Sequence, residues 1–164
     1  MTLPPQQGPG SYRIAVVCLG NICRSPMAHV VLAARVADAG LDVTVDSFGT
    51  GDWHIGGPMD SRAAAALTAE GYDASRHRAA QFTSALVDDF DLVLAMDSDN
   101  LADLRALGVD ERLRRFRDFD PAGPGDVPDP YYGGPDRFGE VLAMVERTSD
   151  ALVGELAALR AART

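Results

Sequence analysis

Short apolar runs alternate with longer segments of helical spacing along most of the chain. The apolar runs stop at glycine or polar residues, which is typical of buried strands, and the longer segments are rich in alanine and leucine and often stop at glycine. The predicted strands are 13–18, 43–48, 91–95 and 113–116. The predicted helices are 25–39, 60–70, 98–107 and 136–161. This alternation predicts the α/β class: a single three-layer domain with a four-stranded parallel sheet and helices on both faces.

The first residues and the chain length set the expected domain organisation. Residues 1–11 are rich in proline, glycine and glutamine and carry no apolar pattern, so we expect a disordered leader before a domain at 12–164. A chain of 164 residues, 46% of them hydrophobic, buries one substantial core and is too short for two comfortable domains. Loops that follow parallel strands meet at one edge of the sheet, and here these are 19–24, 49–56 and 118–135.

Composition argues against several classes of protein. The net charge of −9 opposes nucleic-acid binding, which relies on clustered basic residues. No stretch reaches the roughly 20 apolar residues that span a bilayer, so we expect no membrane insertion. All 15 basic residues are arginine, whereas a Walker-type nucleotide loop requires lysine. Two cysteines without a signal-peptide pattern predict a cytoplasmic location, and nothing in the sequence demands more than a monomer.

The segment CLGNICRSP, at 18–26, joins the first predicted strand to the first predicted helix. Cys18 ends the apolar run, and Gly20 and Asn21 tolerate unusual backbone angles, so this loop can turn its N–H groups inward. Inward N–H groups at a helix N-terminus bind anions and favour thiolate over thiol. Arg24 adds a planar fork that matches two oxygens of a tetrahedral oxyanion. The combination indicates a nucleophile aimed at phosphate.

The two cysteines leave one question open. A structural zinc site needs a second pair of ligands that Cys18 and Cys23 lack, so we expect no metal. A constitutive disulfide is not expected in a reducing compartment. Because the two residues are close together on a tight loop, their sulfurs could close a reversible disulfide under oxidation and spare Cys18 from irreversible acids. A small, core-facing side chain is an equally open interpretation of Cys23.

Together with DSFGT at 46–50 and DPYYG at 129–133, this segment resembles the low-molecular-weight protein tyrosine phosphatase family. The resemblance implies that Cys18 attacks phosphorus, that Arg24 binds the phosphoryl oxygens and that Asp129 is the general acid. It implies protein substrates that carry phosphotyrosine, with inorganic phosphate or similar oxyanions as product or inhibitors. It implies no cofactor.

The resemblance also implies a phosphate-binding loop and residues that support it. The loop comprises Leu19, Gly20, Asn21, Ile22, Cys23 and Ser25. Within it, Asn21 is implied to hold the loop by hydrogen bonds, and Ser25 is suited to donate a hydrogen bond to the sulfur. Ser47 is implied to orient that asparagine and His77 to brace the loop. Phe48 stands where many members carry a small residue, so the packing around Ser47 is an open point.

The choice of the acid depends on the resemblance. A carboxylic acid within hydrogen-bond reach would protonate the leaving phenolate, and the same carboxylate would then deprotonate the hydrolytic water. Spacing alone does not single out one aspartate among Asp118, Asp120, Asp126, Asp129 and Asp136. The DPYYG match selects Asp129.

Apolar residues beside the motifs predict the substrate class. Leu19 and Ile22 lie in the loop, Trp53 follows the second strand, and Tyr131 and Tyr132 follow the acid, so we expect these five to wall a pocket for a phenyl ring. Phosphoarginine phosphatases of the family typically carry threonine where this chain has Ile22. Isoleucine there resembles the tyrosine-directed members.

Two alternatives have discriminating features in the sequence. The related arsenate reductases share the fold and the first loop, but their redox chemistry needs further cysteines downstream, and none follows Cys23. A module that binds phosphotyrosine without cleaving it would be favoured by loss of the cysteine or the acid, and Cys18 and Asp129 are both present.

Overall fold

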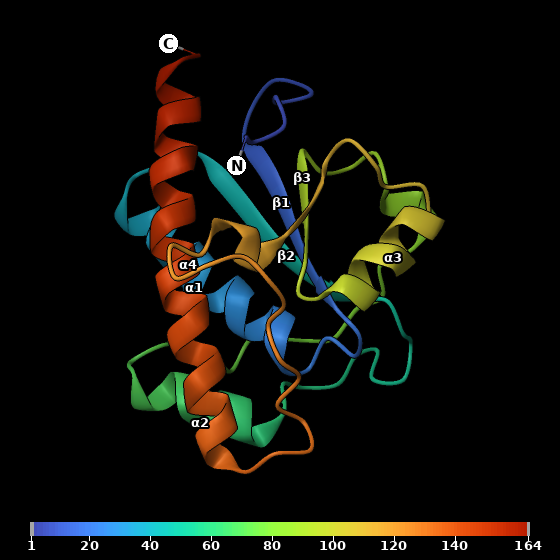
Figure 1. Ribbon diagram of the computed structural model, residues 1–164, viewed down its shortest axis with the longest axis vertical. Coiled ribbons are helices and arrows are strands. Elements are labelled where there is room, and N and C mark those ends of the chain that lie inside the picture. Colours follow the sequence, from blue (N-terminus) through green and yellow to red (C-terminus); the bar gives the residue numbers. More distant parts are fainter. Residues whose placement is uncertain (1, 164) are drawn as a thin grey trace.

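The sheet contains the predicted strands in a parallel arrangement. In the computed structural model, which describes residues 2–163, the strands pair in the order β2-β1-β3-β4, and each neighbouring pair is parallel. Their bounds are β1 Tyr12–Cys18, β2 Val43–Gly49, β3 Leu92–Ala95 and β4 Leu113–Arg115. The predicted strand 113–116 ends one residue early because Phe116 begins a short 3₁₀ segment, η2 (Phe116–Phe119). The α/β class and the parallel sheet are confirmed (Figure 1).

The helices also form where the spacing predicts them. They are α1 Arg24–Asp38, α2 Ser61–Ala69, α3 Ser98–Ala106 and α4 Pro135–Ala161, with a 3₁₀ segment, η1, at Ser84–Leu86. Aspartate side chains start two of these helices. The carboxylate of Asp60 accepts from the backbone N–H of Arg62 at 2.8 Å, and that of Asp97 accepts from Asn100 at 2.7 Å. Each satisfies a donor that the first helical turn leaves without an intrahelical partner.

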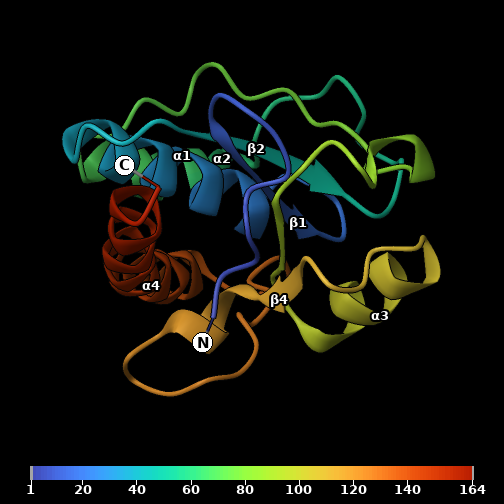
Figure 2. The same cartoon turned by 90° about the horizontal axis from the view of Figure 1, so that it is seen from above.

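The central strand β1 is buried on both sides, which explains its unbroken apolar run. Ile14 and Val16 pack into the core formed with α1 and α4, whereas Ala15 and Val17 pack into a second core that includes Leu104 of α3. Figure 2 shows α1, α2 and α4 on one side of the sheet and α3 on the other. The three-layer arrangement therefore follows from strands that carry apolar side chains on both faces.

The segment before β1, for which we expected disorder, lies against the domain in the structure. Residues 2–11 form no helix or strand, but Leu3 is buried in the main core and the carbonyl of Pro4 accepts from the Tyr12 hydroxyl at 2.8 Å. The backbone N–H of Gln7 donates to Asp91 Oδ1 at 2.7 Å. The apolar Leu3 and these backbone groups hold the segment although its composition is typical of disorder. Among the described residues, no helix has the length and apolar character needed to cross a membrane.

Candidate active site

The loop between β1 and α1 surrounds the sulfur of Cys18, the last residue of β1. Residues 19–23 make the turn and Arg24 begins α1. Asn21 has a φ of 56°, in the left-handed region, and within residues 2–163 it is the one non-glycine residue with positive φ. Asparagine adopts this conformation more readily than most residues. Gly49 of β2 lies against the loop so closely that a Cβ there would stand 2.7 Å from a carbonyl oxygen of the loop, so a side chain would displace it.

Hydrogen bonds of the loop converge on the thiol. The Cys18 side chain is buried, and its Sγ lies 3.0 Å from Ser25 Oγ and accepts from the Asn21 N–H at 3.3 Å. The Asn21 side chain donates to Ser25 Oγ at 2.8 Å and accepts from the Ala80 N–H at 2.9 Å. Ser25 also lies 3.2 Å from the carbonyl of Phe48. Because a hydroxyl has one hydrogen, Ser25 donates either to Phe48 or to the sulfur, and its position suits a charged sulfur.

His77 and Ser47 differ in how they meet the loop. His77 Nε2 donates to the Asn21 carbonyl at 2.7 Å, so it contacts the loop as expected. Among the described residues, Ser47 makes no hydrogen bond to the Asn21 side chain, and its hydroxyl is paired with His29 Nδ1 at 3.3 Å. The prediction that Ser47 orients Asn21 is therefore corrected: Ser25 and Ala80 bond to that side chain.

Phe48, whose effect on the packing around Ser47 was an open point, points its ring into the second core. The ring packs against Phe82 and Phe90 at 5.6 and 5.5 Å between ring centroids.

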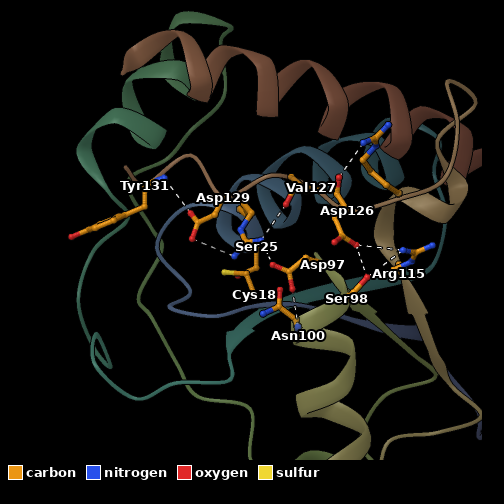
Figure 3. A network of polar contacts seen from close by, with 12 residues as sticks. Cys18, Ser25, Asp97, Ser98, Asn100, Arg115, Asp126, Val127, Asp129 and Tyr131 are labelled. Atoms are coloured by element: carbon orange, nitrogen blue, oxygen red, sulfur yellow. Dashed lines mark hydrogen bonds and ion pairs between the residues drawn. The ribbon is translucent and has the colours of Figure 1, made fainter. Parts of the chain in front are cut away.

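Arg24 is buried and is held on one side by partners distant in sequence. Its NH1 donates to Asp97 Oδ2 at 2.5 Å and to the Val127 carbonyl at 3.1 Å, and its NH2 lies 3.7 Å from Asp129 Oδ2 (Figure 3). Burial lowers the pKa of the guanidinium, but the negative charge of Cys18 and the hydrogen bond that Arg24 donates to Asp97 outweigh it, so that pKa is raised. Asp97 and Val127 thus occupy NH1 and fix the guanidinium in the wall of the cavity that contains Cys18.

Replacing Asp97 with asparagine is expected to weaken oxyanion binding about tenfold. The buried Arg24 would lose its charged partner, and a small displacement of its fork costs binding at the phosphate position. The measurement is the dissociation constant for vanadate by competitive inhibition, and Asp126→Asn is the matched control because Asp126 bonds to Ser98 and not to Arg24. Equal vanadate affinities of the Asp97 variant and wild type would contradict this orienting role.

Asp129 lies on a loop that the core holds in place. Val127, two residues earlier, is fully buried, and its N–H donates to the Met96 carbonyl at 2.8 Å while its own carbonyl accepts from Arg24. The Asp129 side chain is 43% exposed, and its Oδ1 accepts from the Tyr131 N–H at 3.1 Å. This arrangement places the Asp129 carboxyl beside the guanidinium of Arg24, with Oδ2 3.7 Å from NH2.

The other four aspartates of this region have different surroundings. Asp120 is buried between Arg147 and Arg117, and the Arg147 hydrogen bonds lower its pKa further than burial raises it. Asp118 and Asp126 pair with Arg115, and Asp136 lies in the first turn of α4. Of the five candidates, only Asp129 lines the cavity that contains Cys18. The structure therefore distinguishes an aspartate that spacing alone left open.

A cavity of about 250 Å³ opens above the thiol. Its walls are the residues that the sequence predicted, with one addition: Cys18, Leu19, Gly20, Ile22, Cys23, Arg24, Trp53, His54, Asp129, Tyr131 and Tyr132. Trp53 and Tyr132 are 68% and 94% exposed, so they form the rim. The Tyr131 and Tyr132 rings meet edge to face at 5.0 Å between centroids. Sulfur and guanidinium at the base with aromatic rings at the mouth match a phosphorylated aromatic group in chemistry.

Comparison with known proteins agrees with this geometry. A family model described as low molecular weight phosphotyrosine protein phosphatase matches residues 13–162. The chain belongs to this family. It is 50% identical over 159 residues to a low molecular weight protein-tyrosine-phosphatase of Streptomyces coelicolor, covering 92% of this chain and 94% of that protein. It is 46% identical over 140 residues to low molecular weight protein-tyrosine phosphatase A of Mycobacterium tuberculosis, covering 81% and 84%.

Solved structures of phosphatases have the same fold. YfkJ from Bacillus subtilis superimposes with a TM-score of 0.85 at 33% identity, covering 96% of this chain and 100% of that one. A protein tyrosine phosphatase from Entamoeba histolytica, with Hepes in its active site, also has a TM-score of 0.85, at 32% identity over 90% of this chain and 98% of that one. Membership of the family makes the chain a protein-tyrosine phosphatase, a hydrolase.

Three residues of this phosphatase site escaped the analysis of the sequence. Asp97 directly follows the β3 region and starts α3, a position at the same sheet edge as Cys18 that could have drawn attention. His54 follows Trp53 in a loop already expected at the site. Val127 gave no signal, because its contribution is a backbone carbonyl and a buried side chain that anchor the acid loop.

The stability of this phosphatase is expected to fall as pH drops below about 6.5. Burial lowers the pKa of His77 and of His29, so the unfolded chain binds more protons between those lowered values and about 6.5. The contribution of these two histidines to the free energy of unfolding is therefore complete above about pH 6.5. Below that pH the free energy of unfolding decreases, by at most about 1.4 kcal/mol per pH unit for each histidine. Urea unfolding at several pH values measures the slope, and a slope that His77→Gln leaves unchanged would contradict a contribution from His77.

Proposed function

We propose that this phosphatase hydrolyses phosphotyrosine in proteins without a metal, through a cysteinyl-phosphate intermediate. The observation that supports this mechanism is the common cavity of Cys18, Arg24 and Asp129. A thiol, an oxyanion-binding guanidinium and a carboxyl group are the parts that a two-step transfer through sulfur needs.

In the first step, the Cys18 sulfur forms a bond to phosphorus while the bond from phosphorus to the phenolic oxygen breaks. The N–H groups of the loop and the Arg24 donors bind the three phosphoryl oxygens. They stabilise the negative charge that these oxygens carry while the phosphoryl group is transferred. Asp129, protonated for this step, gives its proton to the departing oxygen, and tyrosine leaves as the neutral phenol.

In the second step, water attacks the phosphorus of the intermediate and the sulfur leaves. The Asp129 carboxylate, deprotonated by the first step, takes a proton from that water. Phosphate leaves, and both the thiolate and the protonated acid are restored. Inorganic phosphate and oxyanions of similar shape are therefore expected to compete with substrate for the loop.

The walls of the cavity favour an aromatic phosphate ester. Ile22 and Leu19 present apolar surface beside the sulfur, and Trp53 and Tyr131 add ring surface at the mouth. When the phosphorus of phosphotyrosine lies at the base of the cavity, its phenyl ring is long enough to contact these walls. The side chain of phosphoserine is too short to reach them. Phosphoarginine would place a polar, charged group against Ile22.

The test compares phosphotyrosine, phosphoserine and phosphoarginine peptides of one sequence, with and without a chelator. Hydrolysis is expected for phosphotyrosine, at least about 100-fold faster than for the other two, and is expected to be unchanged by the chelator. Activity that requires a divalent metal, or a preference for phosphoarginine, would contradict the proposal.

We further propose that Cys23 protects the nucleophile from oxidation. Both cysteines are free and buried, and both line the cavity. Burial, followed by the charges of Asp60 and Cys18, raises the pKa of the Cys23 thiol to about 12, so Cys23 is protonated at neutral pH and does not compete as the nucleophile. Peroxide would oxidise Cys18 to a sulfenic acid with loss of water, and Cys23 would displace a second water to form the disulfide.

Mild peroxide treatment followed by mass spectrometry tests this protection. Wild type is expected to show an intramolecular disulfide and to regain activity with a thiol reductant. Cys23→Ser is expected to accumulate sulfinic acid at Cys18 and to recover several-fold less activity. Unbridged, overoxidised Cys18 in wild type would exclude the role.

The catalytic unit is proposed to be a monomer that acts in the cytoplasm. One chain supplies the thiol, the guanidinium and the carboxyl group of the cavity, which are sufficient for the proposed two-step chemistry. Light scattering at micromolar concentration is expected to give the mass of one chain, and a stable dimer would contradict this proposal.

A further inference from the structure

Arg62, the second residue of α2, connects parts of the active site without lining the cavity. Its side chain pairs with Asp60, with NH2 3.0 Å from Oδ2 and Nε 3.2 Å from Oδ1. The backbone N–H of Asp60 donates to the carbonyl of Ile22 in the phosphate-binding loop at 2.9 Å. Arg62 is therefore fixed, through Asp60, to the loop that holds the phosphate.

The other side of Arg62 contacts the turn that carries the acid. Its NH1 donates to the carbonyl of Gly133 at 3.0 Å, and its guanidinium carbon lies 5.5 Å from the centroid of the Tyr131 ring. It also lies 4.6 Å from the centroid of the Phe138 ring, at the start of α4. A planar guanidinium can stack on rings and donate at its edge at the same time, which an ammonium group cannot do.

The turn transmits these contacts to the Asp129 carboxyl. The Tyr131 N–H donates to Asp129 Oδ1 at 3.1 Å, and the Gly133 N–H donates to the Pro130 carbonyl at 2.9 Å. Arg62 contacts the side chain of Tyr131 and the backbone of Gly133, so it holds both sides of this turn. Since the Asp129 side chain is 43% exposed and its Oδ2 is 3.7 Å from Arg24, the turn is its main restraint.

We propose that Arg62 is a positioning residue that keeps the acid turn at a fixed separation from the phosphate-binding loop. The inference rests on the proposed function, in which Asp129 protonates the departing oxygen. Without Arg62, the turn detaches from α2, and the Asp129 carboxyl spends less time within hydrogen-bond reach of that oxygen. The chemistry at sulfur and the oxyanion site, which Arg62 does not touch, remain.

The experiment measures kcat/KM for a series of aryl phosphates whose phenols differ in acidity. This parameter covers the steps up to departure of the phenol, so its dependence on the leaving group reports how well the acid is placed. Arg62→Gln is expected to lower kcat/KM about tenfold for phenyl phosphate and less than about twofold for p-nitrophenyl phosphate, because p-nitrophenolate departs without protonation. Its vanadate affinity is expected to stay within about twofold of wild type, and Arg62→Lys is expected to be intermediate.

Arg35→Gln is the matched control. Arg35 also pairs with carboxylates, at 2.8 Å from Asp150 and 3.5 Å from Glu146, and also lies over a tyrosine ring, 5.7 Å from the centroid of Tyr72. It joins α1 to α4 away from the cavity, so its removal is expected to leave the dependence on the leaving group unchanged. In an Asp129→Ala background, Arg62→Gln is expected to cause no further loss for phenyl phosphate, because the acid is already absent.

The outcomes separate the two hypotheses. An equal loss for all aryl phosphates in Arg62→Gln, or a full further loss in the Asp129→Ala background, would overturn the positioning role and leave the proposed function standing. If kcat/KM depended on the acidity of the phenol in the same way in wild type and in Asp129→Ala, the acid role itself would be overturned. The inference about Arg62 would then be overturned with it.

Discussion

Cys18→Ser is expected to reduce turnover of aryl phosphates by on the order of 10⁵-fold or more. A serine hydroxyl is a much weaker acid than a thiol and stays protonated at neutral pH, so it is a poor nucleophile toward phosphorus. The loop, Arg24 and the hydrogen bonds from Ser25 and Asn21 are otherwise preserved, so oxyanion binding is expected to persist. Steady-state hydrolysis of p-nitrophenyl phosphate measures the loss, and vanadate affinity measures the intact site.

The control for this change is Cys23→Ser. Cys23 lines the same cavity, but burial keeps its thiol protonated, so its replacement is expected to alter kcat/KM by less than about tenfold. If turnover survived in Cys18→Ser and was lost in Cys23→Ser, the assignment of the nucleophile would be reversed.

Asp129→Ala is expected to lower kcat/KM for phosphotyrosine by about 10²- to 10⁴-fold, the range typical of a lost general acid. The loss is expected to be smaller for p-nitrophenyl phosphate, because nitrophenolate departs without protonation. Turnover is expected to fall for both substrates, since the same carboxylate activates water in the second step. The measurement is the ratio of kcat/KM values for the two substrates.

Asp126→Ala is the control for the acid. Asp126 lies on the same loop, three residues earlier, but its carboxylate bonds to Ser98 and Arg115. We expect it to keep the wild-type substrate ratio. If Asp126→Ala changed the ratio of kcat/KM values and Asp129→Ala did not, Asp126 would be the acid and the assignment of Asp129 would be wrong.

Most of the secondary structure was predictable because the sheet is buried on both faces. Unbroken apolar runs such as β1 are possible only where both faces are covered, and glycine or aspartate at helix ends marks the limits of the helices. The first residues differed from expectation because composition does not reveal that Leu3 finds a place in the core.

The candidate site was predictable to the extent that it lies within one short segment. Cys18, Asn21 and Arg24 are close in sequence, so the residue types and their spacing define a thiol and an anion site before any long-range contact is known. The partners of that segment come from elsewhere. Ser47, expected to contact Asn21, pairs with His29, because β2 and α1 bring those two side chains together.

By itself, the sequence determined the fold class and placed Cys18 and Arg24 on one loop after the first strand, because apolar spacing predicts the strands and helices and these two residue types lie within one short segment. Only the tertiary structure decided that Asp129, which the motif had selected, lines the same cavity as Cys18, that Asp97 and Val127 bond to Arg24, and that Arg62 connects the two loops. These contacts join residues up to 103 positions apart. Such pairs meet because parallel strands bring their carboxyl ends to one edge of the sheet, and the spacing of residues along the chain does not specify which side chains touch there.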